Sequence, residues 1–193
     1  MAEFTADRIL DAARRSLLSV GYGGLSTRQI AEDAGVPLSQ IHYHFGSKRQ
    51  LILALLDREN ARLLERQTRL FRDEVPLWKQ WEQACDFLED DLASGYVRVL
   101  QEMMAAGWSD PEVASAVRRD LRGWYELLTD VAERALDRLG ALGPFTPAEA
   151  AALVGNAFLG SEALILLGVD ERQVPSRAAL RRVAELIRAT EGG

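Results

Sequence analysis

The sequence predicts an all-α protein in which a small N-terminal three-helix domain precedes a larger helical region. Apolar residues recur three and four positions apart along most of the chain, which is the spacing of amphipathic helices. Alternation of apolar and polar residues, the pattern of half-buried strands, is missing. The chain has 193 residues, of which 48% are hydrophobic, so it can bury a substantial core.

The first predicted helix begins at Thr5, whose hydroxyl caps it, and ends at Gly21. Its inward stripe consists of Ile9, Leu10, Ala13 and Leu17.

A helix-turn-helix is predicted next. Ser26 and Gln29 form a capping box, in which the serine accepts from the Gln29 N–H and the glutamine side chain reaches back. Gly35 permits a tight turn, and Pro37 fits the first turn of the second helix, where no N–H is needed. This is the layout with which small proteins present a helix to the major groove of DNA.

Longer helices follow, and capping signals mark their starts. Ser47 to Gln50 forms a second capping box, Asp110 precedes a proline, and Thr146 to Glu149 combines a capping box with a proline. The predicted ranges are 47 to about 71, 76–94, 96–108, 111–141, 147–168 and 176–190.

The second helix of the motif has an outward face suited to reading bases. Ile41 and Phe45 point into the small core with Val36. Hydroxyl, imidazole and amide groups form hydrogen bonds with base edges, and aliphatic groups contact the thymine methyl. The outward face and its flanks carry Leu38, Ser39, Gln40, His42, Tyr43 and His44.

Thr27 and Lys48 stand at the starts of the two helices that flank this reading helix. Side chains and free N–H groups at such positions meet DNA phosphates. A lysine at a helix start opposes the helix dipole, and this misfit favours a phosphate-binding role for Lys48.

The segment from Thr5 to Leu55 resembles the TetR family of transcriptional regulators, above all STRQIAEDAGV at 26–36 and YHFGSK at 43–48. The resemblance implies a DNA-binding domain over 1–49 and a helical ligand-binding and dimerisation domain over 50–193. It also implies that phosphates are held by Thr27, Tyr43 and Lys48, and that bases are faced by Arg28, Leu38, Ser39, Gln40 and His42. The family often has an aromatic residue where this chain has His42.

Such a protein would be a homodimeric repressor of a palindromic double-stranded DNA operator, with half-sites one DNA turn (~34 Å) or more apart. A small-molecule effector of unknown identity would release it. Aromatic and methionine side chains line adaptable pockets, and the candidates are Met103, Trp108, Trp124 and Phe158. The helix at 147–168 is apolar almost all round, which predicts a partner subunit beside it. The predicted dimer contacts are Gly155, Leu159, Gly160, Val183 and Ile187.

Two other classes of protein stay open. The net charge is −6; residues 1–49 hold six Lys/Arg and five Asp/Glu, which is +1 and leaves −7 for the rest. Because DNA-binding domains usually show a basic patch, this weak charge favours a ligand-binding or scaffold module with a vestigial helix-turn-helix. An enzyme is disfavoured, since no acid, base and nucleophile cluster is visible.

No metal or cofactor is predicted. His42 and His44 are two apart on a helix, so they diverge too far to share one ion. The single cysteine, Cys85, has the acidic neighbours Asp86 and Glu89, which raise a thiol pKa and disfavour the nucleophilic thiolate. One cysteine, no secretory pattern and no apolar run near the ~20 residues that span a bilayer indicate a cytoplasmic protein without a membrane partner.

Overall fold

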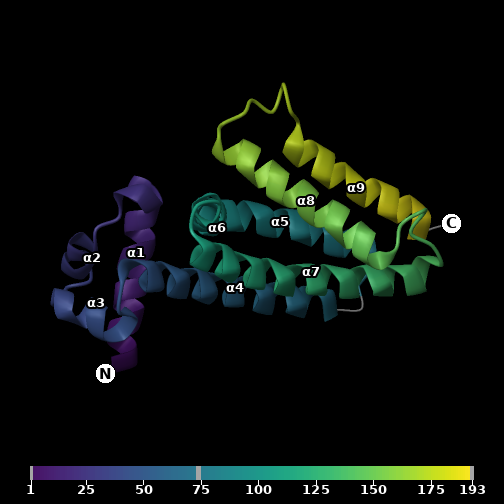
Figure 1. Ribbon diagram of the computed structural model, residues 1–193. Helices are drawn as coiled ribbons and strands as arrows, with labels where there is room; N and C mark the ends of the chain where they lie inside the picture. Colours follow the sequence, from purple (N-terminus) through teal and green to yellow (C-terminus); the bar gives the residue numbers. More distant parts are fainter. Residues whose placement is uncertain (1, 73–74, 192–193) are drawn as a thin grey trace. The chain divides into compact units, whose positions relative to one another are not determined.

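The computed structural model describes residues 2–72 and 75–191, and within them it confirms the all-α fold (Figure 1). No strand occurs in these residues. The helices are α1 (Ala2–Gly24), α2 (Thr27–Asp33), α3 (Leu38–Phe45), α4 (Lys48–Arg72), α5 (Leu77–Ser94), α6 (Tyr96–Gly107), α7 (Pro111–Leu139), α8 (Pro147–Leu166) and α9 (Ser176–Glu191).

The chain divides into two compact units. The first unit comprises the chain up to Arg62 together with Gly95–Asp120, and it contains α1 to α3, α6 and the first parts of α4 and α7. The second unit comprises Leu63–Ser94 and the chain from Leu121 onward. Since α6 packs against α1, the first unit is larger than the helix-turn-helix itself. The functional boundary at residue 49 stays a prediction.

Capping side chains explain why most predicted helix boundaries agree with the structure. At the start of α8, Glu149 N donates to Thr146 Oγ1 (3.3 Å) and Thr146 N donates to Glu149 Oε2 (2.8 Å), which completes the predicted capping box. At the start of α7, Glu112 N donates to Asp110 Oδ1 (3.1 Å), as expected for a capping aspartate.

The two serine caps in the first unit form only half of the predicted boxes. Ser26 Oγ accepts from Gln29 N (3.5 Å), but Gln29 Nε2 donates to Asp33 Oδ1 (2.9 Å) instead of reaching back. Ser47 Oγ accepts from Gln50 N (3.2 Å), while the Gln50 side chain donates to Glu112. Carboxylates accept stronger hydrogen bonds than neutral groups do, so Gln29 and Gln50 donate to nearby carboxylates instead of to the backbone of the cap residue.

The ends of two N-terminal helices also differ from the prediction. α1 begins at Ala2, so Thr5 lies inside the helix and is not its cap. Gly21 leaves the helical conformation as predicted (φ 69°, ψ 174°), although a further turn runs to Gly24. Pro37 is the N-cap of α3, with ψ 145°, and so precedes the helix by one position.

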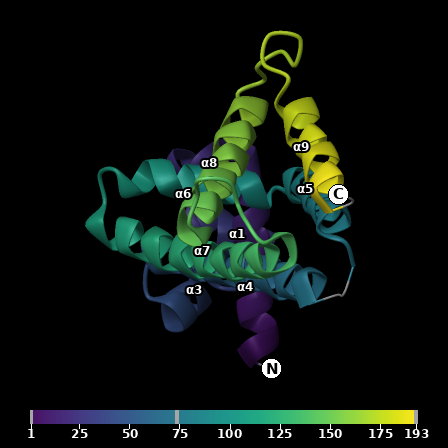
Figure 2. The same cartoon turned by 90° about the vertical axis from the view of Figure 1, so that its right-hand side faces the viewer.

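The two units differ in how deeply they bury apolar side chains. Among the described residues, the largest fully buried side chains all belong to the first unit; they include Ile9, Ile30, Ile41, Leu55 and Met103. The second unit, in which α5 and α8 pack against α9 (Figure 2), has a smaller cluster of Cys85, Leu88, Phe158 and Leu180.

By length and composition α8 is able to cross a bilayer, since one 18-residue window has a mean hydropathy of 1.3. We expected no apolar stretch long enough for this, and α8 departs from that expectation by length and composition only. One helix of this kind is weak evidence for a membrane segment, because the apolar helices of soluble proteins meet the same criterion.

Asp120 is buried on α7, and its Oδ2 accepts no hydrogen bond from any residue that the structure describes. Its charged neighbours are Arg119, whose Nε lies 3.6 Å from Oδ1, and Asp57 of α4. Burial and then the Asp57 charge raise the pKa of Asp120 from 3.8 to about 6, against the opposing charge of Arg119.

Asp120→Asn is therefore expected to stabilise the protein near pH 7. Between about pH 4 and 6 the folded state holds a proton that the unfolded state has lost, so wild-type stability falls as pH rises through this window. The cost at neutral pH reaches about 3 kcal/mol, which the neutral amide avoids. Urea unfolding of wild type and variant at pH 4.5 and 7 measures this difference in the free energy of unfolding. Parallel pH profiles for wild type and variant would contradict this assignment.

Candidate nucleic-acid interface

The turn between α2 and α3 sets the direction of the reading helix. Gly35 has φ +63°, a conformation that side chains disfavour. An Arg8 Nη2 hydrogen donates to Ala34 O, and a Cβ placed on Gly35 would lie 2.7 Å from that nitrogen. The backbone angle therefore favours glycine at this position, and a Cβ there would also displace the end of the Arg8 side chain.

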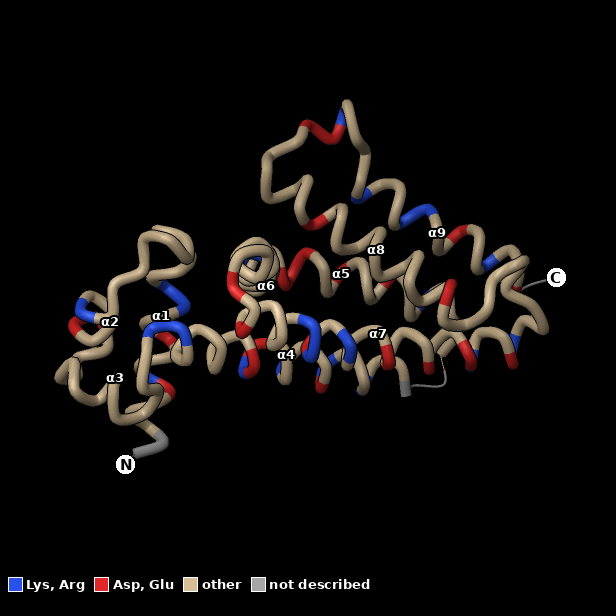
Figure 3. The backbone as a smooth tube through the Cα atoms, viewed as in Figure 1, with Lys and Arg blue, Asp and Glu red and all other residues tan. Residues whose placement is uncertain are grey.

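α3 presents the predicted reading face to solvent. Ile41 is fully buried, whereas Tyr43 is 77% exposed, and its ring meets His44 edge to face at 5.0 Å. Figure 3 shows that α3 carries no Lys, Arg, Asp or Glu, so this face is neutral. The other exposed members of the face are Leu38, Ser39 and His42, while Gln40 is half-buried.

The His42 ring has a fixed hydrogen-bonding pattern. Its Nδ1 lies 3.1 Å from Gly46 O, and because a carbonyl only accepts, Nδ1 carries the hydrogen. In the neutral ring Nε2 is then an acceptor. An acceptor matches the amino groups that adenine and cytosine present in the major groove.

Lys48 is held at the opening of α4. Its Nζ donates to Leu25 O at 3.0 Å and lies 5.5 Å from the centroid of the Tyr22 ring. The ammonium group keeps further N–H donors for another acceptor. Thr27, at the start of α2, is half-buried. Arg28 is exposed and forms no ion pair with the residues that the structure describes.

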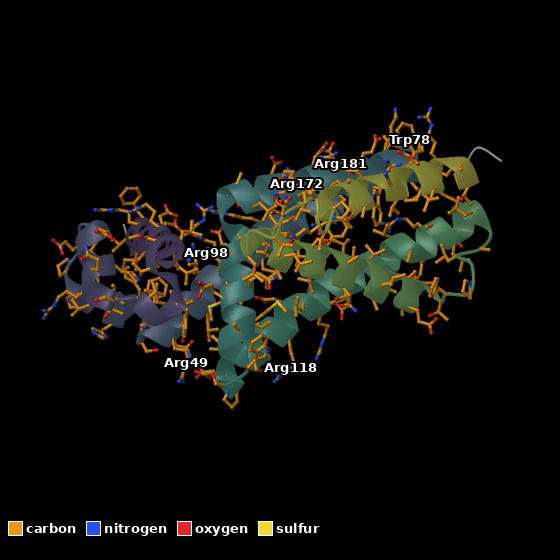
Figure 4. The ribbon with its side chains drawn as sticks, turned by 90° about the horizontal axis from the view of Figure 1, so that it is seen from above. Arg49, Trp78, Arg98, Arg118, Arg172 and Arg181 are labelled. Atoms are coloured by element: carbon orange, nitrogen blue, oxygen red, sulfur yellow. The ribbon has the colours of Figure 1, made fainter. Side chains whose placement is uncertain are left out.

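Arg49 is next to Lys48 but is already neutralised. Its Nε lies 2.8 Å from Asp110 Oδ2, and its Nη1 lies 2.8 Å from Glu112 Oε2 (Figure 4). These carboxylates, Glu112 first, raise the pKa of Arg49. The count of basic residues in the motif therefore overstates the charge that is available to a phosphate.

The four predicted pocket residues divide between the two units. Met103 is fully buried in the first unit, and Trp108 is 87% exposed after the end of α6, so its assignment to a pocket was wrong. Trp124 and Phe158 share the apolar cluster of the second unit, where Trp124 Nε1 donates to Gln67 Oε1 (2.9 Å). Burial raises the pKa of the Cys85 thiol in this cluster to about 11.

The predicted dimer residues also separate into different groups. Gly155 does not face a second subunit: a Cβ there would lie 2.4 Å from Tyr125 Cε1 of α7, so the glycine serves packing within the chain. Gly160 is exposed, and the half-buried residues are Leu159, Val183 and Ile187.

The prediction missed several exposed apolar side chains on α8 and α9. Leu153 is 58% exposed, Leu167 following α8 is 78% exposed, and Leu186 of α9 is 69% exposed. The spacing of Leu153, Gly160 and Leu167 by seven residues, two helical turns, was the signal that could have found this stripe.

Comparison with known proteins agrees with this geometry. Residues 9–55 match the family model of "Bacterial regulatory proteins, tetR family". The HTH-type transcriptional regulator UidR of Escherichia coli K12 is 23% identical over 198 residues, covering 100% of this chain and 93% of UidR. The HTH-type transcriptional repressor AcnR of Corynebacterium efficiens is 40% identical over 57 residues, 30% of each chain.

Solved structures share the fold over nearly the whole chain. A TetR-family transcriptional regulator from Agrobacterium tumefaciens superposes with a TM-score of 0.81 at 22% identity and covers 98% of both chains. The regulator FadR from Bacillus subtilis, in complex with stearoyl-CoA, has a TM-score of 0.77 at 15% identity, covering 93% of this chain and 96% of FadR.

The fold and the exposed reading helix define a helix-turn-helix DNA-binding transcriptional regulator rather than an enzyme. The chain thus carries the DNA-binding segment of the TetR family at residues 9–55 and resembles TetR-family regulators over nearly its whole length.

Gly35→Ala is expected to destabilise the protein by about 2 kcal/mol, since it combines a left-handed backbone with displacement of Arg8. The matched control is Gly140→Ala, which has a similar φ of +75° but nothing within 4 Å of its Cβ, and should cost about 1 kcal/mol. Urea unfolding compares the two. Equal losses would mean that the Arg8 contact contributes nothing.

Proposed function

We propose that this regulator is a cytoplasmic repressor that binds a palindromic operator as a homodimer and is released by a small-molecule effector. The observation that carries the proposal is the exposed, uncharged face of α3, flanked by Arg28 and Lys48. Side chains of this kind read base edges, while the flanking cations meet phosphates. AcnR, which resembles this chain over its DNA-binding segment, is a repressor by name.

In this proposal Thr27, Tyr43 and Lys48 hold phosphates, and base contacts come from the exposed side chains of α3 together with Arg28. His42 offers Nε2 as an acceptor, which favours an adenine or cytosine at its position in the half-site. Leu38 offers an aliphatic contact for a thymine methyl.

The exposed apolar stripe on α8 and α9 supports a homodimer. Leu153, Leu167 and Leu186 are 58%, 78% and 69% exposed, and large apolar side chains left in solvent on one part of a protein favour an interaction site there. The shallow burial in the second unit fits a core that a partner subunit completes. A two-fold dimer would present two copies of α3 to half-sites about one DNA turn apart.

An effector would act by preferring a state in which the two reading helices are wrongly spaced. Trp124 and Phe158 of the second unit remain the candidate contacts for it. FadR, a structural neighbour, binds stearoyl-CoA, so a bulky apolar ligand is the first class to test.

Lys48→Ala should weaken binding to every DNA sequence by about tenfold and reduce the slope of log affinity against log salt by about one, because one phosphate contact is lost. Lys79→Ala, which removes the other lysine from α5, is the matched control. Fluorescence anisotropy on an operator selected from genomic DNA measures both. Salt-independent or absent binding by the wild type would favour the vestigial helix-turn-helix.

His42→Ala should relax the base preference at one position of each half-site, with a loss of about 1–3 kcal/mol of discrimination. Binding to operators that carry each base at that position provides the measurement. An unchanged preference at all positions of the site would show that His42 does not face a base.

Leu153→Asp and Leu186→Asp should each convert the dimer to a monomer and lower operator affinity, because a charge enters the apolar contact. Trp108→Asp changes an even more exposed apolar residue, in the first unit, and should leave the dimer intact. Sedimentation equilibrium decides the matter: a dimer that survives both leucine changes places the interface elsewhere.

A further inference from the structure

A carboxylate of α6 lies against the break in α1. Gly21 (φ 69°, ψ 174°) interrupts the helix, so the next amide is directed away from the helical hydrogen-bond ladder. Tyr22 N donates to Glu102 Oε2 at 3.0 Å. A Cβ placed on Gly21 would lie 3.0 Å from Glu102 Oε1, so the glycine also leaves room for this carboxylate.

α1 and α6 contact each other at a second point, near the start of α6. Gly95, the N-cap of α6 with φ +85°, leaves room for the Leu18 side chain, whose Cδ1 would lie 2.6 Å from a Cβ at that position. Gly95 and Glu102, seven residues apart at the start and within α6, thus meet α1 on the two sides of its break, at Leu18 before Gly21 and at Tyr22 after it. Arg98, one turn before Glu102, places its Nε 3.6 Å from Glu102 Oε1 (Figure 4).

The same short segment of α1 holds Lys48. The Lys48 ammonium lies 5.5 Å from the Tyr22 ring centroid and donates to Leu25 O at 3.0 Å. Leu25 N in turn donates to Tyr22 O at 3.4 Å, which closes the turn. Both contacts of the ammonium therefore belong to a four-residue segment whose first amide is fixed by Glu102.

We propose that Glu102 is a positioning residue for operator binding, which acts through Tyr22 to place the Lys48 ammonium for a DNA phosphate. The inference rests on the proposed function, because it concerns operator affinity. Long-range electrostatics alone predicts the opposite sign, since removal of a carboxylate near DNA strengthens binding.

The test is a double-mutant cycle on operator binding with Glu102→Ala, Lys48→Ala and the double variant. Glu102→Ala should weaken binding by about as much as Lys48→Ala, roughly tenfold, and also lower the salt slope by about one. In the Lys48→Ala background, Glu102→Ala should add less than a twofold loss, because the two residues act on one contact. Fully additive losses overturn the proposal.

Three further variants separate positioning from general effects. Glu32→Ala removes an exposed carboxylate from α2 in the same unit and should strengthen binding. Glu102→Gln keeps an oxygen that accepts from Tyr22 N and should retain most of the wild-type affinity. Tyr22→Leu removes only the ring beneath Lys48 and should reproduce the coupled loss, which keeps the test decisive if Glu102→Ala folds poorly.

The two hypotheses fail in different ways. If the wild type shows no salt-dependent operator binding, both the proposed function and this inference are wrong. If Lys48→Ala weakens binding while Glu102→Ala and Tyr22→Leu do not, the regulator function stands and only the positioning role of Glu102 is wrong.

Discussion

The contact of Arg8 with the backbone of the α2–α3 turn is the constraint on which the reading helix depends. Its guanidinium donates to Ala34 O, and the missing Cβ of Gly35 leaves room for this contact. With the turn fastened to α1, and with Ile30 and Ile41 fully buried, α3 has one direction relative to α1 and α2. A rigid frame matters because base contacts need donors and acceptors to be correctly placed before DNA arrives.

The electrostatics of the motif follow from a few well-held groups rather than from bulk charge. Arg49 is neutralised by Asp110 and Glu112, and α3 itself is uncharged. Lys48 is fixed by a carbonyl and a ring, and helix starts supply backbone N–H donors. A regulator built in this way depends more on the geometry of individual phosphate contacts than a strongly basic domain does, which fits an acidic chain with a net charge of −6.

Local chemistry determined what could be predicted from the sequence. Thr146, Glu149 and Asp110 cap their helices as expected, because capping partners lie within three residues along the chain. The outward face of α3 followed from helical spacing alone. Two errors arose where a partner is distant in sequence, since Gln50 bonds Glu112 and Gly155 accommodates Tyr125, whereas Gln29 failed to complete its box because it bonds Asp33 four residues on. Trp108 failed similarly, since composition does not reveal that the turn after α6 leaves its ring in solvent.

Partners that are distant in sequence also explain what α8 contributes to the second unit. Asn156 interrupts its apolar surface, and Tyr125 Oη donates to Asn156 Oδ1 at 2.7 Å, so the amide oxygen has a partner within the chain. Gly155 and Phe158 pack inward, whereas Leu153 and Leu167 stay exposed. The Asn156 oxygen thus has its hydrogen-bond partner inside the chain, and the side chains that α8 leaves exposed are largely aliphatic. A self-complementary two-fold contact requires a patch of this kind, because each residue on it must meet a symmetry-related copy of the same surface.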